Sequence, residues 1–390
     1  MATLSDDPRS STNPIFNDNT LKLGVFGYNG PGVSMTKVPE LYIPTWDNSV
    51  RVSQLADDAG LEALVPYARW RPFGPPTSPR GRVFETYTWA AGMAASTRHS
   101  CIMSTSHTTT LHPLVAAKQA TTVDHISHGR SAINIVCGWF VPEIEMFGAE
   151  IKPHGERYAH AHEWIEVMKR VWTRDEPVSF EGNYVRVKDA VSSPKPVQAP
   201  FPALMNAGGS VDGQHFAAQH CDIAFVLASD QSPEAIKAQV DKYRRLAKEE
   251  YGRHLQVWLL SYVVQRETEA EARAYVKRYV EEFGDHEVVD MFIKYQIESA
   301  KTMPPNVVEK IRYGLMAGSG GVDLVGTPTM IAERLKMLSN CGIDGVLLSW
   351  IDYEQGLKAF VKDVLPLLEQ MDLRKATRSA AVAMAGQELA

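Results

Sequence analysis

Two polar residues interrupt apolar, strand-like segments of the chain and are the first candidates for chemistry. Asn134 lies within the apolar run 132–137, where an amide is unfavourable unless its polar atoms find partners. Thr105 ends another apolar run and belongs to the hydroxyl-rich segment 104–110. One interpretation is structural, with both side chains bonded to neighbouring backbone. The other is that an amide and a hydroxyl face a polar cofactor ring or an oxygen species.

A second group of residues has the character of a phosphate site. Residues 206–210 read Asn-Ala-Gly-Gly-Ser directly after an apolar run. Glycines allow the backbone to approach a ligand, and free amide groups at the start of the next helix bind phosphate. Arg157 and Tyr158 open an amphipathic helix and are placed to reach the same group. A plain turn and a solvated helix start are the alternatives, and we expect the phosphate site.

Other candidates are less specific. Trp139 follows the run with Asn134 and can wall a pocket, although a lone Trp is more often part of a core. Arg69 and Arg71 either hold an anionic substrate group or are simply solvated. His160 and His162 are two positions apart on a predicted helix, so they do not share a face. No carboxylate and histidine cluster has the spacing of metal ligands, and we expect no metal.

The elements that must position these residues follow from the hydrophobic pattern. Short apolar runs predict eight strands, at 21–26, 61–65, 100–105, 132–137, 203–206, 222–226, 256–264 and 345–349. Helical patterns lie between most of them, including 46–59, 84–96, 114–126 and an amphipathic helix around 164–172. This alternation predicts a single (β/α)8 TIM barrel with insertions, and a doubly wound open sheet is the alternative. In a barrel, functional residues follow the carboxyl ends of the strands, where the candidates above fall.

Two segments break the regular spacing. Residues 175–202 are rich in Pro, Ser and Val and predict an insertion that contains β structure. Residues 267–323 predict a charged helical insertion, which acts either as a lid or only as a connector. We expect residues 1–19 to form an N-terminal arm, residues 20–373 the barrel, and residues 374–390 a C-terminal tail.

Composition excludes several classes of function. The formal net charge of -6 offers no basic field for nucleic acid. No apolar run approaches the roughly 20 residues that span a bilayer, and residues 1–19 lack the apolar core of a signal peptide. We therefore expect a cytoplasmic protein without a membrane or nucleic-acid partner. The four cysteines are far apart and predict buried, reduced thiols.

Several motifs together resemble the bacterial luciferase-like flavin monooxygenases, nearest their pyrimidine-ring-opening and dimethylsulfone branches. The resemblance runs from about residue 21 to about residue 373, and its motifs are residues 132–139, Glu143, and residues 156–158, 193–196, 206–210 and 325–328. It implies a (β/α)8 barrel that uses reduced FMN and O2 to oxygenate a small organic substrate, with cleavage of a C–N, C–S or C–halogen bond as one outcome. It also implies a separate NAD(P)H:FMN reductase and a homodimer or homotetramer.

The resemblance also implies roles for individual residues. Thr105 and Asn134 correspond to a pair that flanks the O2 site beside the flavin, and Val65 to an apolar residue that lines this site. Trp139 and Glu143 match the loop after the fourth strand. The expected contacts on the phosphate side are Tyr158, Ala207, Gly208, Gly209 and Ser210.

The chain also departs from the pyrimidine-opening branch. His112 stands where that branch has a proline, and the loop at residues 70–72 differs, so uracil is not implied as substrate. Two other functions stay open. One is hydride transfer with a deazaflavin (F420) on the same barrel, and the other is flavin binding without turnover.

Overall fold

The computed structural model describes residues 7–75, 78–297 and 303–375 of the chain. Within these residues, eight parallel strands pair side by side, and β11 pairs in parallel with β1 to close the sheet into a barrel. The predicted (β/α)8 barrel is confirmed, and the open-sheet alternative is wrong. The barrel strands are β1 (Lys22–Phe26), β2 (Ala63–Val65), β3 (Cys101–His107), β4 (Ser131–Val136), β7 (Ala203–Asn206), β8 (Ile223–Val226), β9 (Gln256–Gln265) and β11 (Gly345–Ser349).

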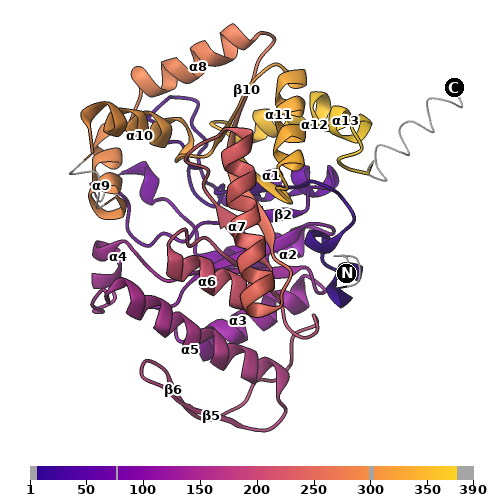
Figure 1. Ribbon diagram of the computed structural model, residues 1–390, viewed down its shortest axis with the longest axis vertical. Coiled ribbons are helices and arrows are strands. Elements are labelled where there is room, and N and C mark those ends of the chain that lie inside the picture. Colours follow the sequence, from indigo (N-terminus) through magenta and orange to yellow (C-terminus); the bar gives the residue numbers. More distant parts are fainter. Residues whose placement is uncertain (1–6, 76–77, 298–302, 376–390) are drawn as a thin grey trace, which may run out of the picture.

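Helices cover the outside of the barrel (Figure 1). On α5 the apolar residues repeat at helical spacing, and Trp164, Met168 and Trp172 are buried against the barrel as this spacing predicts. The covering helices are α1 (Trp46–Asp58), α2 (Thr86–Ser96), α3 (Pro113–Ile126), α5 (His154–Thr173), α6 (Val211–His220), α7 (Pro233–Tyr251), α11 (Pro328–Asn340), α12 (Tyr353–Asp363) and α13 (Leu365–Gln370).

Alternation along the strands decides which side chains enter the barrel. Successive residues of a strand point to opposite faces. Met103 belongs to the apolar cluster inside the barrel, whereas Ile102 and Ile133 pack outward against helices. Thr105 and Asn134 follow two residues after inward-facing positions, so they also point inward, above this apolar cluster. The barrel interior is therefore packed below and polar at its carboxyl end.

The segment 267–323 holds three helices and the start of a strand. The helices are α8 (Glu269–Glu281), α9 (His286–Gln296) and α10 (Pro305–Gly318). The strand β10 (Val322–Gly326) was not expected from the sequence, because five residues are too few for a clear period. Ser261 of β9 pairs with both β10 and β11, so β10 lies on the edge of β9 that β8 occupies lower down.

The segment 175–202 contains an antiparallel hairpin of β5 (Val178–Glu181) and β6 (Arg186–Ala190). It lies beside α5 (Figure 1). The Glu163 carboxylate of α5 accepts backbone N–H groups from residues 183–185 and fastens the hairpin turn.

The described N-terminal residues pack against the opposite end of the barrel. They form the short 3-10 helices η2 (Pro8–Ser11) and η3 (Pro14–Phe16), and Ile15 is fully buried. Asn13 donates to the carbonyl of Ser131, where β4 begins, so this segment closes the amino end of the barrel. Residues 1–6 of the expected arm and 376–390 of the expected tail lie outside the described residues.

Candidate functional site

A cavity of about 690 Å³ opens where the barrel strands end. The ends of β3 and β4, the loops after β2 and β7, and the helices α5 and α9 all contribute to its wall. This volume lies within the range of small-molecule and cofactor sites, and its position is the usual one for a barrel.

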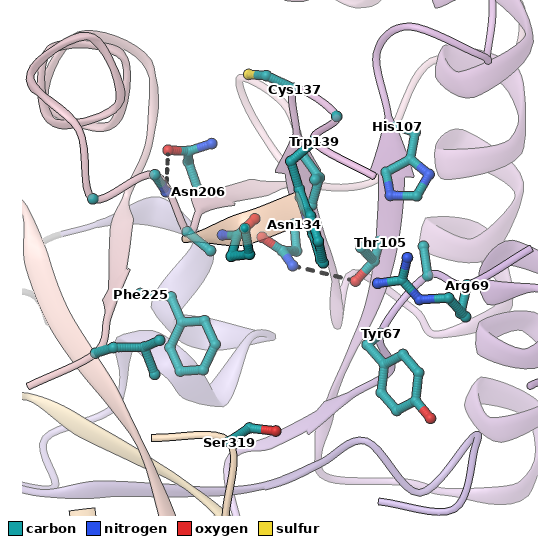
Figure 2. A pocket seen from close by; sticks show the side chains of 18 of the residues that line it. Tyr67, Arg69, Thr105, His107, Asn134, Cys137, Trp139, Asn206, Phe225 and Ser319 are labelled. Atoms are coloured by element: carbon teal, nitrogen blue, oxygen red, sulfur yellow. Dashed lines mark hydrogen bonds between the residues drawn. The ribbon is translucent and has the colours of Figure 1, made fainter. Parts of the chain in front are cut away.

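Thr105 and Asn134 lie side by side in this cavity (Figure 2). They are partners in the β3–β4 pairing, and the Asn134 amide nitrogen donates to the Thr105 hydroxyl at 3.3 Å. Thr105 in turn donates its proton to the carbonyl of Pro66 at 2.6 Å. Among the described residues, the buried side-chain oxygen of Asn134 has no partner. The pair therefore presents to a ligand one free amide acceptor and the second amide hydrogen of Asn134.

The loop after β7 and the start of α6 form an end of the cavity that is rich in N–H groups. Asn206 holds the turn, since its side-chain oxygen accepts from the Gly208 amide at 2.9 Å. Ser210 caps α6 by accepting from the Gly213 amide at 3.1 Å. A β-carbon on Gly208 would collide with the Tyr158 hydroxyl and lie 2.8 Å from the Gly213 α-carbon. The backbone at Gly208 therefore leaves no room for a side chain, whereas a β-carbon on the neighbouring Gly209 would face open space.

Two residues from the first turns of α5 complete this end. Arg157 donates to the carbonyl of Gly138, and its buried Nε has no partner among the described residues. Burial raises the pKa of Tyr158 well above its ordinary value, so its phenol keeps its proton and remains a donor. Together with the start of α6, these groups suit a phosphate monoester.

The loop after β2 forms another wall of the cavity. The Arg69 guanidinium packs over the Phe73 ring at 4.3 Å and lies 5.3 Å from the centre of the Trp139 ring. Glu143 lies behind it and accepts from Arg69 at 3.2 Å. Its other oxygen accepts from the backbone of Trp70 at 2.5 Å and of Arg71 at 3.2 Å. Glu143 therefore fixes this loop, and with it the position of Arg69.

His107 lies beside the same carboxylate. Its Nδ1 is 3.9 Å from the Glu143 carboxylate, and its ring lines the cavity. Burial lowers the pKa of His107 to about 4, and Glu143 only partly opposes this effect. Its imidazole is therefore neutral near pH 7 and offers one donor and one acceptor.

The insertion between β9 and β10 covers the outer side of the cavity. Phe292 of α9 packs edge to face on Trp139 at 5.4 Å, and Tyr295 packs on Phe140 at 5.4 Å. Ser319, at the end of α10, also lines the cavity and donates to the carbonyl of Val33. The insertion thus contributes lining residues and is more than a connector.

Most residues expected at the site do line the cavity: Thr105, Asn134, Trp139, Tyr158, Ala207, Gly208, Gly209 and Ser210. The structure does not place Val65 or Glu143 in the lining. Val65 is fully buried in the apolar cluster below, and Glu143 lies behind Arg69. Sequence reasoning missed Arg80, Ser319, Phe292 and Tyr295, because they come from loops and an insertion without a motif.

Two further features bear on the kind of site. In the described ranges, no three His, Cys, Asp or Glu side chains gather as metal ligands. No helix in this part of the chain is long and apolar enough to cross a membrane. All four cysteines are buried and unpaired, as the sequence predicts, and Cys137 borders the cavity.

Residues 21–345 match the family model described as luciferase-like monooxygenase. The chain is 30% identical over 372 residues to an FMNH2-dependent dimethylsulfone monooxygenase of Pseudomonas putida, covering 92% of this chain and 98% of that protein. It is 30% identical over 370 residues to the pyrimidine monooxygenase RutA of Cronobacter turicensis, covering 93% and 96%. A riboflavin lyase crystallised with modified FMN and riboflavin aligns with a TM-score of 0.81 at 20% identity, over 91% of this chain and 93% of that one, which shows a shared fold.

Proposed function

The chain belongs to the luciferase-like monooxygenase family, and from this membership we propose that it uses reduced FMN and O2 to oxygenate a small organic substrate. The observation that carries the proposal is one cavity with a phosphate-type end and the Asn134–Thr105 pair. Two relatives from different branches, named for dimethylsulfone and for pyrimidines, support oxygenation as the shared chemistry.

The residues present fit FMN. Arg157, Tyr158 and the backbone of residues 208–210 would hold the phosphate, because they supply a cation, a phenol donor and free amides. Asn134 would lie against the polar edge of the ring system, where its unpartnered oxygen can accept an N–H. Trp139 would bound the ring on one side.

When bound, reduced FMN supplies the electrons that O2 accepts. The chain orients the reactants and keeps water away, and the apolar side chains of Phe26, Phe225 and Leu260 line the cavity for this purpose. Thr105 holds the amide of Asn134 in place, and the second amide hydrogen would be free to stabilise a negative charge that develops on oxygen. Neutral His107 is available to accept or return a proton near this pair.

The proposal includes the partners and setting of the enzyme. A separate NAD(P)H:FMN reductase supplies the reduced cofactor, so the enzyme is one half of a two-component system. It works in the cytoplasm as a homodimer or homotetramer. Gel filtration and a reconstituted assay with a flavin reductase test these points directly.

The decisive experiment compares FMN with riboflavin. We expect wild-type protein to bind FMN at least about tenfold more tightly than riboflavin, because charge-assisted bonds to phosphate contribute on this scale. Arg157→Met should remove most of that preference, while Arg174→Met, at an exposed position at the end of the same helix, should keep it. Equal affinity for both flavins, or binding of a deazaflavin in place of FMN as read by absorbance, would contradict the proposal. Oxygen consumption with supplied reduced FMN separates the enzyme from a flavin-binding protein without turnover.

A further inference from the structure

We propose that the wall formed by Arg69 and Arg80 binds an oxyanion of the substrate, a carboxylate or a sulfonate carried on an apolar body. This inference rests on the proposed function, because it assigns to the substrate the part of the cavity that the FMN phosphate does not use. It names a substrate class for the same site.

The charge of the cavity wall is the first observation. Among the described lining residues there are three arginines, Arg69, Arg80 and Arg157, and no Asp, Glu or Lys. The whole chain carries a formal net charge of -6, so the positive charge of the cavity wall differs from the average charge of the protein. A concave site lined by one sign of charge raises the local concentration of ligands of the other sign. One arginine suffices for the phosphate end, and two remain.

Arg80 is the stronger of the two remaining cations. It is only 8% exposed and donates to two backbone carbonyls, of Ser34 at 2.6 Å and of Gly32 at 2.9 Å. It forms no ion pair with a carboxylate in the described part of the chain. The nearby Asp285 is itself paired with Lys37 at 3.0 Å. A buried guanidinium without a counter-ion is costly, and a bound anion would offset that cost.

Arg69 also has an N–H donor that the described part of the protein does not use. Glu143 occupies one terminal nitrogen, but the buried Nε has no partner among the described residues. The guanidinium carbon lies 4.3 Å from the centre of the Phe73 ring, so the ring supports a planar group whose donors suit an oxyanion. Burial lowers the pKa of Arg69, and repulsion by the charge of Arg80 adds to this effect. An anion placed at this wall would relieve the repulsion.

The position of this wall separates it from the phosphate end. Figure 2 shows Arg69 and Tyr67 on the side of the pocket opposite Asn206, with Asn134 and Thr105 between the two sides. A molecule held by its anionic group at Arg69 and Arg80 would therefore extend toward the central pair.

The rest of the wall indicates an apolar body for that molecule. Phe73 and Trp139 are stacked at 5.5 Å beside Arg69, and Phe292 closes over them. A flat or aliphatic group attached to the oxyanion would lie against these rings.

The test uses matched small probes on the FMN-loaded protein. Benzenesulfonate and benzenesulfonamide have similar shape but differ in charge, and their dissociation constants are measured by NMR titration. We expect the sulfonate to bind about tenfold more tightly to wild type, and Arg69→Gln and Arg80→Gln each to remove most of this preference. Arg71→Gln, exposed in the same loop, should retain it. Because Arg80 also holds backbone carbonyls, Arg80→Lys provides a folded variant that should keep part of the preference.

The outcomes separate this inference from the function on which it rests. Equal binding of both probes, binding of neither, or a preference that survives both glutamine variants would overturn the oxyanion site. Loss of the FMN preference over riboflavin in Arg80→Gln, with none in Arg157→Met, would assign this wall to the FMN phosphate and also overturn it. Neither result decides the proposed oxygenase function, which is tested on the wild-type protein by its preference for FMN over riboflavin and by its consumption of O2 with reduced FMN.

Discussion

The amide nitrogen of Asn134 lies 3.3 Å from the hydroxyl of Thr105, across the pairing of β3 and β4. Because the Thr105 proton is committed to the Pro66 carbonyl, Thr105 can only accept from Asn134. The hydroxyl therefore orients the amide, and the amide faces the ligand. This geometry refines the expectation that both side chains act on oxygen directly, since only Asn134 has a hydrogen left to donate.

We predict that Asn134→Ala still binds FMN within about threefold of wild type but forms several-fold less product per O2 consumed, because the variant lacks the amide donor that would stabilise a negative charge on oxygen. The measurement is the ratio of oxygenated product to H2O2, with a substrate found in a panel of sulfonates and carboxylates. Ser106→Ala is the matched control, since Ser106 is a buried neighbour on the same strand and does not line the cavity. An unchanged ratio in Asn134→Ala would remove this residue from the oxygen chemistry.

We predict that Gly208→Ala weakens FMN binding by at least about tenfold and lowers the free energy of unfolding by about 1–3 kcal/mol. The added β-carbon would displace the Tyr158 hydroxyl and the start of α6 together. Gly209→Ala has open space around the new β-carbon and should leave the free energy of unfolding unchanged. Flavin titration and urea unfolding measure the two effects. Equal free energies of unfolding for the two variants would mean that Tyr158 and the start of α6 move aside at no cost in stability.

Glu143→Gln tests the anchoring of the loop after β2. The variant keeps an acceptor for the Trp70 backbone but removes the charge that neutralises Arg69. We expect the free energy of unfolding to fall by about 2 kcal/mol, because a buried guanidinium loses its partner. Added benzenesulfonate should raise the melting temperature of this variant more than that of wild type. Similar shifts in both proteins would show that Arg69 does not reach the ligand.

A hydrogen-bonded pair of histidines, buried His220 and half-buried His162, joins α6 to α5 and predicts sensitivity to acid. His220 accepts from Lys169 at 3.2 Å and shares a hydrogen bond of 2.6 Å with His162. Burial, followed by the charges of Lys169, His162 and Arg253, lowers the pKa of His220 to about 2. The unfolded chain therefore binds a proton below the ordinary pKa of about 6.5 that the folded chain does not, so stability falls as the pH drops below 6.5.

In His220→Gln, the free energy of unfolding should fall less steeply as the pH drops from 6 to 4.5, by about 1 kcal/mol per pH unit compared with wild type. Urea unfolding across this range provides the measurement, and His254→Gln at an exposed position is the control. If the free energy of unfolding depended on pH equally in His220→Gln and in wild type, the histidine pair would not be the cause of the acid sensitivity.

The buried ion pair of Glu62 and Arg374 joins the residue before β2 to the segment after α13. The two side chains are 0% and 1% exposed and lie 2.6 Å apart. Arg374→Met leaves a buried carboxylate without its cation, so we expect a loss of about 3 kcal/mol in the free energy of unfolding. Lys375→Met, at the next position, removes only an exposed charge and should change stability by less than about 0.5 kcal/mol. Equal effects of the two substitutions would contradict a stabilising role for the buried pair.

The sequence by itself determined the barrel and the centre of its site. Strands buried on both faces must be almost wholly apolar, so the runs around Thr105 and Asn134 were visible as strands, and their polar members stood out. Parallel strands in neighbouring units bring their carboxyl ends together, so these two residues and the loop 206–210 had to meet. The helical spacing of apolar residues predicted α5. Arg157 and Tyr158 lie in the first turns of this helix, and the prediction therefore placed them at its start.

Only the tertiary structure decided which loop residues enter the cavity and with which partners. Arg69 and Arg71 are indistinguishable in the sequence, and one is stacked in the site while the other is exposed. Arg80 lies in the short 3-10 helix η4 (Pro79–Gly81), which is too short to show a period, so nothing local showed that it is buried without a carboxylate partner among the described residues. Glu143, for which a cofactor contact was predicted, lies outside the cavity lining and pairs with Arg69. Such assignments depend on contacts between segments far apart in the chain, and hydrophobic periodicity records only which face of an element is buried.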